Sequence, residues 1–286
     1  MIIAHEKAIY KRHTPYKKEW YDMEYMKRGR DIILKQEDLD LAETLDCGQA
    51  FRWSPVADGF CGYFLNKPLT ILAERDHFIL KDTTEDEFLN VWADYFDLYT
   101  DYGEMKRIFS EDKTLSAACA FAGGIRLLKQ DFFECLISFI ISQNNNIPRI
   151  KGIIGRLCDM FGGFPDADRL AAKTADGLSP LRAGFRAKYI EDAAQKVSSG
   201  IISEDMFAGL SDAEAEKLLR TVRGIGPKVA QCVMLYGMHR ISAFPEDVWI
   251  KRVMAEYYPD GLPDYVMPYR GIAQQYLFHY IRNNRV

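Results

Sequence analysis

The chain has 286 residues, 48% of them hydrophobic, and a net charge of −4. This is enough to bury a sizeable core in two subdomains, and the longest apolar runs, such as Cys135–Ser142, are too short to cross a bilayer. Basic residues interrupt the N-terminus, which excludes a signal peptide, so we expect a cytoplasmic monomer with no membrane partner.

The cysteines and histidines are scattered along the chain. There are six cysteines and five histidines, and no Cys-x-x-Cys pair occurs. A free cysteine in a helical apolar pattern behaves as a small hydrophobic residue. We therefore expect no disulfide framework, no iron–sulfur cluster and no required cofactor.

Positive charge is concentrated in two segments of this acidic protein. Residues 1–30 carry eight Lys or Arg against four Asp or Glu, and residues 217–252 carry seven against two. Screening limits the influence of distant charges to about 10 Å at ordinary salt. A local basic segment can therefore still attract phosphate, although the simpler interpretation of any one charge run is a solvated face.

The N-terminal part of the chain predicts a basic extension and then a β-rich domain. Residues 1–30 are polar and weakly patterned, and we interpret them as a tail or arm. Residues 31–105 show short strand-like segments joined by local turns, which is typical of an antiparallel meander. The predicted strands are Asp31–Leu34, Gln49–Trp53, Phe60–Phe64, Thr70–Ala73 and Phe78–Leu80. Thr84 with Glu87 forms a capping-box pattern that opens a helix.

Residues 106–286 predict a mainly α-helical domain, which makes the fold class α+β. Asp131–Ser142 is apolar nearly all round and should be a central buried helix. The next helix has Pro148 in its first turn and stops at Gly162-Gly163. Ser211 with Glu214 is a second capping box.

A glycine-containing turn lies between two helical patterns and predicts a helix–hairpin–helix. Gly224 and Gly226 allow a turn that exposes successive N–H groups, and Pro227 opens the following helix. A helix N-terminus binds phosphate without base specificity. Many helix–helix turns contain glycine, but the flanking basic residues favour phosphate binding here.

Lys228 and Asp247 are the two candidate catalytic residues. Lys228 lies in the first turn of the hairpin's second helix, and Cys232 shares its face at i+4. Its amine could attack a sugar carbon to form a Schiff base, or it could simply contact phosphate, and the spacing leaves both open. Asp247 begins the next helix, where it could be an ordinary N-cap or could stabilise a cationic sugar. A nucleophile with a carboxylate is the minimum for cleaving an N-glycosidic bond.

Five segments in order resemble the 8-oxoguanine DNA glycosylases of the helix-hairpin-helix superfamily. They are CGQAFRW (47–53), SFIISQNNNIPRI (138–150), GFRAKYI (184–190), residues 218–252, and IAQQYLF (272–278). The resemblance covers roughly residues 31–280. It implies a bifunctional DNA glycosylase/AP lyase whose partner is duplex DNA containing 8-oxoguanine, associated with the nucleoid when bound.

The resemblance also implies a role for individual residues. Lys228 would be the Schiff-base nucleophile and Asp247 the essential carboxylate. The base pocket would be made by the carbonyl of Gly48, the amide of Gln274, and the two walls Phe278 and Cys232. An extruded base does need stacking faces and edge-reading polar groups.

Further positions would contact DNA or hold a structural cation. Asn144 would fill the gap left in the duplex, with Arg149 and Phe185 near the opposite cytosine. The remaining expected DNA contacts are Asn145, Arg186, Gly224, Gly226 and Trp249. The carbonyls of Arg220, Val222 and Ile225 would hold a structural monovalent or divalent cation.

Two residues differ from the pattern of the family, and two other functions stay open. Trp249 stands where many relatives have a histidine, and Phe185 replaces a common tyrosine. One alternative is a glycosylase for another damaged purine, such as an alkylated base, which would not need Lys228. The other is a non-catalytic helix-hairpin-helix DNA-binding module, which would not explain Asp247 together with the base-pocket set.

Overall fold

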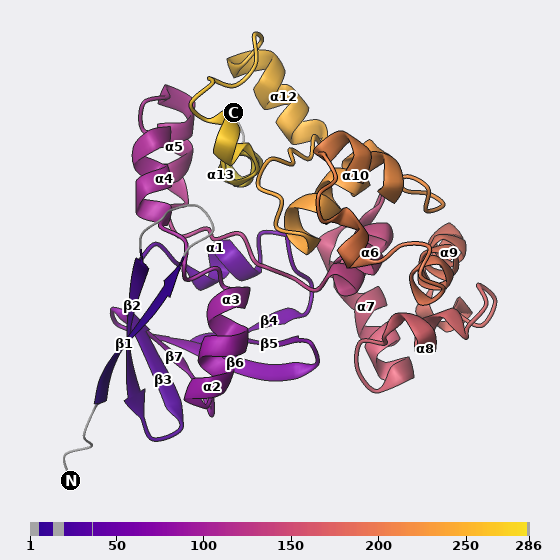
Figure 1. Cartoon of the computed structure of the whole chain (residues 1–286), viewed down its shortest axis with the longest axis horizontal. Coiled ribbons are helices and arrows are strands. Elements are labelled where there is room, and N and C mark those ends of the chain that lie inside the picture. Colours follow the sequence, from indigo (N-terminus) through magenta and orange to yellow (C-terminus); the bar gives the residue numbers. More distant parts are fainter. Residues whose placement is uncertain (1–5, 14–19, 36, 285–286) are drawn as a thin grey trace. The chain divides into compact units, whose positions relative to one another are not determined.

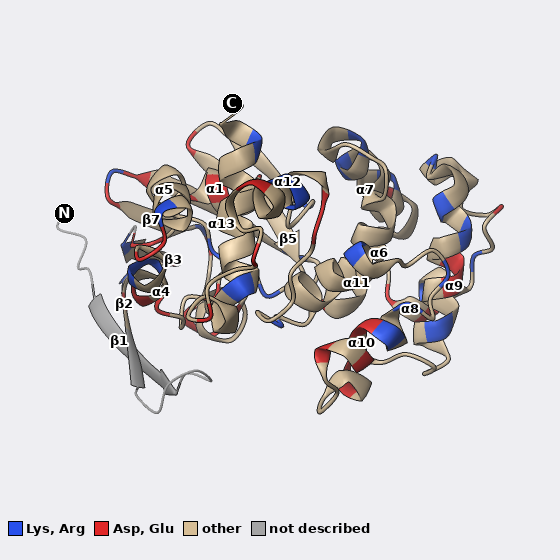
Figure 2. Ribbon diagram, turned by 90° about the horizontal axis from the view of Figure 1, so that it is seen from above, with Lys and Arg blue, Asp and Glu red and all other residues tan. Residues whose placement is uncertain are grey.

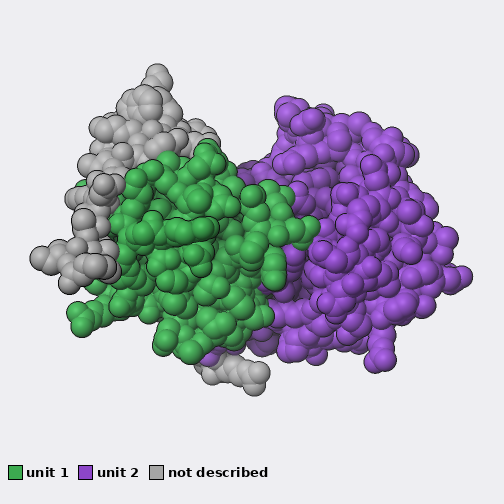
Figure 3. All heavy atoms as spheres, turned by 90° about the horizontal axis from the view of Figure 1, so that it is seen from below, with its two compact units in different colours: residues 1–49, 53–129 green, residues 50–52, 130–286 purple. Residues whose placement is uncertain are grey.

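Residues 6–13, 20–35 and 37–284 are described in the computed structural model of the chain. The chain divides into two units: unit 1 comprises residues 1–49 and 53–129, and unit 2 comprises residues 50–52 and 130–286 (Figure 3). Among the described residues, no helix is long and apolar enough to span a membrane.

Unit 1 contains one antiparallel sheet (Figure 1). The described strands are β1 (Glu6–His13), β2 (Trp20–Arg28), β3 (Asp31–Lys35), β4 (Trp53–Val56), β5 (Gly59–Phe64), β6 (Lys67–Glu74) and β7 (His77–Leu80). Their order is β1-β2-β3-β7-β6-β5-β4. Alternating apolar side chains such as Phe60, Ile71 and Leu80 are buried, as expected when one face of a sheet covers a core. The predicted β-rich N-terminal domain is confirmed.

The N-terminal extension is not a simple arm where it is described. β1 pairs with β2 along its whole length, and β2 pairs with β3. Met23 and Tyr25 of β2 are buried, and the Tyr25 hydroxyl donates a hydrogen bond to Glu85 at 2.6 Å. Two apolar residues spaced two positions apart in a polar segment were the sequence signal for this strand, and the prediction missed it. Residues 1–5 and 14–19 lie outside the described residues.

The segment predicted as a strand at Gln49–Trp53 is irregular before Trp53. The Gln49 side chain is buried, and its amide donates to the carbonyls of Thr44 and Arg126 at 2.8 Å. Its oxygen accepts the N–H of Leu128 at 3.0 Å. Gln49 therefore satisfies three backbone groups of unit 1, which a regular strand would not bring within its reach.

Unit 1 also contains helices, and it ends at residue 129 instead of the predicted boundary at residue 105. They are α1 (Leu41–Leu45), α2 (Glu85–Glu87), α3 (Ala93–Tyr95), α4 (Tyr102–Phe109) and α5 (Lys113–Phe121), with a π-helical turn η1 (Phe88–Trp92). Thr84 and Glu87 form the predicted capping box. Arg126, after α5, is buried and donates to the carbonyls of Asp38 and Asp97, so the chain stays in unit 1 up to residue 129.

Unit 2 is helical, as predicted. Its α-helices are α6 (Phe132–Ser142), α7 (Ile147–Phe161), α8 (Ala167–Ala171), α9 (Ala187–Ser198), α10 (Asp212–Leu219), α11 (Pro227–Cys232), α12 (Val248–Tyr257) and α13 (Arg270–Asn283). A π-helical turn, η5 (Val233–Gly237), continues α11, and short 3₁₀ turns are η2 (Ser179–Leu181), η3 (Gly184–Arg186), η4 (Glu204–Phe207) and η6 (Met267–Tyr269).

α6 is the central helix of unit 2. Every side chain from Cys135 to Ile141 is buried, and α7, α9, α11 and η5 all contact this helix. The segment 50–52 also packs here: the Phe51 ring meets the Phe139 ring edge-on at 5.8 Å between centroids, and the Arg52 guanidinium pairs with Glu134 at 2.7 Å.

Candidate active site

The turn between α10 and α11 forms the predicted hairpin, and α9 holds it in place. Gly224 has φ 81°, and a Cβ added there would lie 2.3 Å from a ring carbon of Tyr189 on α9. The Asp192 carboxylate accepts the N–H of Arg223 at 2.7 Å. Lys196 pairs with Asp192 at 2.8 Å and donates to the Thr221 carbonyl at 2.6 Å.

These three α9 residues were not identified from the sequence. Tyr189, Asp192 and Lys196 occur at i, i+3 and i+7, the spacing of one helix face. That periodicity was the available signal, but it does not identify the turn to which the face binds.

The first turn of α11 is open to an anion. Its N-cap is Gly226, no side chain caps it, and Pro227 occupies the first turn. The N–H groups of Lys228 and Val229 therefore lack intrahelical partners and carry the positive end of the helix dipole. Acidic side chains occur at the start of α10 (Figure 2), while the turn after α10 carries Arg220 and Arg223.

Gly224→Ala should destabilise the protein more than Gly226→Ala does. A left-handed backbone costs a non-glycine residue about 1–2 kcal/mol, and overpacking against the Tyr189 ring adds about 1–3 kcal/mol. Gly226 has φ −95° and nothing within 4 Å of an added Cβ, which makes it the matched control. Thermal unfolding measures the difference. Equal melting temperatures for the two variants would show that Gly224 is not required by its backbone or by Tyr189.

Lys228, Cys232 and Asp247 lie close enough to interact electrostatically. Lys228 is exposed, with Nζ 5.9 Å from the centre of the Phe139 ring, and Cys232 is buried one turn further along the same face. Burial raises the pKa of the Cys232 thiol, the Lys228 ammonium opposes this through its charge and a hydrogen bond, and the Asp247 carboxylate adds to the increase. The Lys228 amine and the Asp247 carboxylate thus both influence the buried Cys232 thiol.

Asp247 is an N-cap with an unused oxygen. Its Oδ1 accepts the N–H groups of Trp249 and Ile250, each at 2.9 Å, at the start of α12. Oδ2 accepts no hydrogen bond from the residues that the structure describes. Asp247 therefore caps α12, as the sequence allowed, and its second carboxylate oxygen stays available to another group.

Gln274 presents a buried acceptor beside the Asp247 loop. Its side chain is 3% exposed, and its Nε2 donates to the Pro245 carbonyl at 3.0 Å. This bond orients the amide so that Oε1 is buried without a hydrogen-bond partner among the described residues. An unsatisfied buried acceptor costs about 1–3 kcal/mol, so a ligand that donates to it gains that energy back. Phe278, one turn along α13, is half-buried, with the Arg282 guanidinium 5.8 Å from its ring centre.

The asparagine run and the start of α9 are joined through Arg186. Arg186 is buried and donates to the carbonyls of Gln143 and Asn144. Asn144 is exposed and has a left-handed backbone conformation, with φ 47°. Phe185 is 54% exposed, and the guanidinium carbon of Arg186 lies 4.4 Å from the centre of its ring.

Burial and the nearby charge of Arg149 lower the pKa of Arg186. The structure therefore presents Asn144, Arg149 and Phe185 at the surface, while the guanidinium of Arg186 is occupied by backbone carbonyls. Asn145 lies among them, and its amide donates to the Ile141 carbonyl at 3.2 Å.

The remaining predicted site residues are Trp249 and Gly48. Trp249 is half-buried, with the Arg252 guanidinium 5.1 Å from its ring centre. Gly48 belongs to unit 1 and has φ 99°, which favours glycine.

The three carbonyls expected to hold a cation lie in the hairpin. The carbonyl of Val222 accepts the Ile225 N–H at 3.1 Å, whereas the carbonyls of Arg220 and Ile225 accept no hydrogen bond within the described part of the chain. Free carbonyl oxygens are suitable ligands for hard cations. Within the same residues, no cluster of three His, Cys, Asp or Glu side chains could hold a metal ion.

Comparisons with known proteins identify the family of the chain. Residues 31–136 match the family model described as 8-oxoguanine DNA glycosylase, N-terminal domain, and residues 137–263 match the HhH-GPD superfamily of base excision DNA repair proteins. An N-glycosylase/DNA lyase of Saccharomyces cerevisiae is 30% identical over 269 residues, covering 79% of this chain and 70% of the yeast protein. The chain belongs to this glycosylase family.

Two solved structures resemble most of the chain. The Clostridium acetobutylicum 8-oxoguanine glycosylase/lyase, in complex with double-stranded DNA containing cytosine opposite 8-oxoG, superposes with a TM-score of 0.83 at 35% identity. It covers 93% of this chain and 99% of that structure. MBOgg1 in complex with a low affinity DNA ligand has a TM-score of 0.84 at 40% identity and covers 90% and 97%.

The predicted family and α+β fold are thus confirmed. The family models begin at residue 31, so β1 and β2 precede the part that they match.

Proposed function

We propose that this chain flips 8-oxoguanine out of duplex DNA, excises it, and cleaves the abasic strand by β-elimination. The observation that carries the proposal is the buried, unpartnered Gln274 oxygen among the described residues, held by the loop that leads to Asp247, whose own Oδ2 accepts no hydrogen bond from them. The names of the relatives, N-glycosylase/DNA lyase and 8-oxoguanine glycosylase/lyase, support the same reaction.

In the proposed mechanism the Lys228 amine attacks C1′ of the extruded nucleotide. The new N–C1′ bond replaces the glycosidic bond to the base, which leaves with a proton. The Asp247 carboxylate stabilises the positive charge that develops on the sugar. The resulting Schiff base acidifies C2′–H; loss of this proton expels the 3′ phosphate and cleaves the strand.

Recognition of the base is assigned to the pocket residues. The Watson–Crick edge of a guanine presents N–H donors, and the Gln274 oxygen is a buried acceptor for one of them. Cys232 and Phe278 would stack on the two faces of the base, and the Gly48 carbonyl would accept the N7 hydrogen that distinguishes 8-oxoguanine from guanine. The hairpin N–H groups would hold a backbone phosphate, with a cation on the carbonyls of Arg220, Val222 and Ile225. Action as a monomer in the cytoplasm stays a prediction.

Trapping with borohydride tests the proposal. The protein is incubated with an 8-oxoguanine:C duplex and borohydride, and base release and a covalent protein–DNA adduct are measured together. We expect both with this duplex and neither with an undamaged G:C duplex. Excision of 3-methyladenine without an adduct would instead support the alkylated-base alternative, and DNA binding without base release would support a non-catalytic module.

Gln274→Met should slow excision about 10- to 100-fold, since a lost base contact is worth about 1–3 kcal/mol. The fold should be little affected, because removing the unsatisfied Oε1 offsets the cost of leaving the Pro245 carbonyl without its donor. Single-turnover excision and affinity for a duplex carrying an abasic analogue measure the two effects. The control is Gln275→Met: Gln275 is also buried but accepts the Tyr236 hydroxyl at 2.6 Å, so its loss should lower the melting temperature instead. A uniform loss of DNA affinity in Gln274→Met would contradict the assigned role.

A further inference from the structure

We propose that Gln231 is a positioning residue that holds the helix of Lys228 against the loop of Asp247. The inference rests on the proposed function, since it assigns Gln231 a part in aligning the two groups that act on the sugar. Gln231 lies on α11 three residues after Lys228, and its amide contacts the loop three residues before Asp247.

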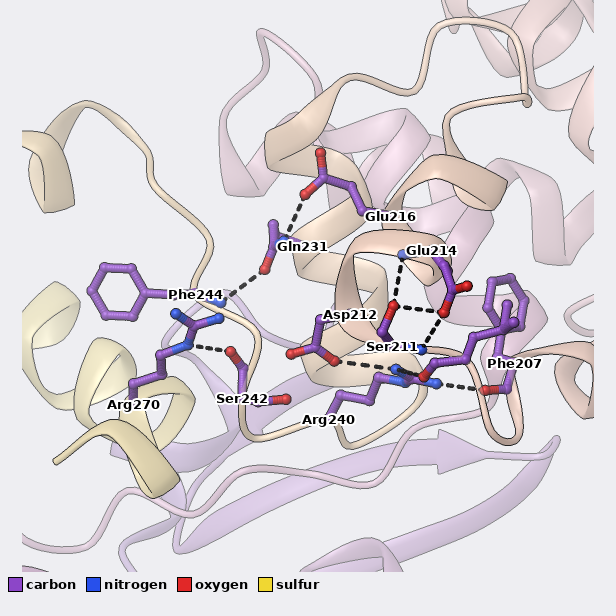
Figure 4. Close-up of polar contacts among 11 residues, drawn as sticks. Phe207, Ser211, Asp212, Glu214, Glu216, Gln231, Arg240, Ser242, Phe244 and Arg270 are labelled. Carbon is purple, nitrogen blue, oxygen red and sulfur yellow. Dashed lines mark hydrogen bonds and ion pairs between the residues drawn. The ribbon is translucent and has the colours of Figure 1, made fainter. Parts of the chain in front are cut away.

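The Gln231 amide uses both of its ends. Its Nε2 donates to Glu216 on α10 at 2.7 Å, and its Oε1 accepts the N–H of Phe244 at 2.9 Å. Figure 4 shows this chain of contacts running from Glu216 through Gln231 to the backbone of Phe244. One side chain thus connects α10, the nucleophile helix and the segment that leads to Asp247.

Glu216 is itself anchored on the hairpin side. Its Oε1 accepts from the Arg220 guanidinium at 3.2 Å, while Oε2 takes the Gln231 amide. The carboxylate therefore orients Gln231 with its N–H₂ towards α10 and its oxygen towards Phe244. An amide flip would place two oxygens together and lose the Phe244 acceptor.

Among the described residues, the other side-chain hydrogen bonds to this loop do not involve α11, although the Arg240 N–H donates to the Met234 carbonyl of η5 at 2.9 Å. Arg240 donates to the carbonyls of Phe207 and Leu210 and to the Asp212 carboxylate, and Arg270 donates to the Ser242 carbonyl (Figure 4). These contacts fix the loop to α10 and α13, whereas Gln231 fixes it to the helix of Lys228.

Alignment of a nucleophile with its supporting charge is sensitive to small shifts. A misplacement of about 1 Å can slow a reaction about 100-fold. Only a side chain with both a donor and an acceptor can hydrogen-bond to the Glu216 carboxylate and to the Phe244 N–H at once. A carboxylate at position 231 would instead repel Glu216, because the two groups carry the same charge.

The test is Gln231→Glu alone and combined with Glu216→Gln. In the double variant the carboxylate at position 231 accepts from both the Phe244 N–H and the new amide at position 216, so both hydrogen bonds are restored. We expect the single variant to lose about tenfold in single-turnover excision and in adduct formation, corresponding to about 1.4 kcal/mol. The double variant should return to within about threefold of wild type. The affinity for a duplex with an abasic analogue should stay within about threefold throughout.

Gln195→Glu is the matched control, because Gln195 is exposed on α9 and its side chain makes no hydrogen bond with the described residues. It should excise at the wild-type rate. If Gln231→Glu does not fold, Gln231→Met removes both hydrogen bonds without adding charge, and the same tenfold loss is expected.

A wild-type rate in Gln231→Glu, or no recovery in the double variant, overturns the inference. So does a rate loss that only matches the unfolded fraction measured by thermal melting, because that is the result of a purely structural role. Failure of the proposed function is a different result: wild-type protein would then form no adduct with the 8-oxoguanine duplex at all.

Discussion

Lys228→Gln is expected to abolish the borohydride-trapped adduct and to slow excision by at least about 10³-fold, the scale on which losing a nucleophile acts. The amide nitrogen of glutamine does not attack carbon, although it retains much of the length and polarity of lysine. The fold should be kept because Lys228 is exposed. A denaturing gel of the trapped complex and a single-turnover assay measure the result.

A control must distinguish the loss of the positive charge of Lys228 from the loss of its amine as a nucleophile. Lys217→Gln is the control: Lys217 is exposed on α10, which leads into the same hairpin, and its side chain makes no hydrogen bond or ion pair with the described residues. It should weaken DNA binding modestly, more so at low salt, and should still form the adduct. An undiminished adduct with Lys228→Gln would mean that another amine attacks the sugar.

Asp247→Asn is expected to fold normally but to excise about 10²- to 10³-fold more slowly, as when one electrostatic contact to the transition state is removed. Asparagine caps helices about as well as aspartate, so the two N–H bonds to position 247 should persist. The charge facing the cationic sugar is lost. Melting temperature and single-turnover excision report on the two effects separately.

Another N-cap supplies the control for Asp247. Asp166 caps α8 by accepting the Arg169 N–H at 2.8 Å, and it is exposed. Asp166→Asn should change neither stability nor excision appreciably. If Asp247→Asn also excises at the normal rate, Asp247 is only a helix cap and the mechanism needs another carboxylate.

Features carried by local chemistry could be predicted from the sequence. The capping boxes at Thr84 and Ser211 are present, and α6 begins and ends within a residue of its predicted bounds. Gly224 and Pro227 correctly marked the hairpin, because a positive φ and a first helical turn are requirements of single residues.

Features that depend on distant partners were missed. β2 was taken as part of an arm because two buried residues, Met23 and Tyr25, are too short an alternation to indicate a strand before its pairing with β3 is known. The end of unit 1 lies at residue 129 because Arg126 returns to carbonyls of residues 38 and 97, a contact with no local signature.

By itself, the sequence determined the α+β class, the hairpin, and Lys228 and Asp247 as candidates for attack on a sugar. Only the tertiary structure decided that, within the described part of the chain, Asp247 keeps one oxygen free while it caps α12, and that Gln274, bound to the Pro245 carbonyl, buries an unpartnered acceptor. Only the structure showed that Gln231 joins α11, which carries Lys228, to the loop that leads to Asp247. The physical reason is that capping and turn preferences act over a few residues, whereas hydrogen bonds between side chains depend on which distant segments the packed core brings together.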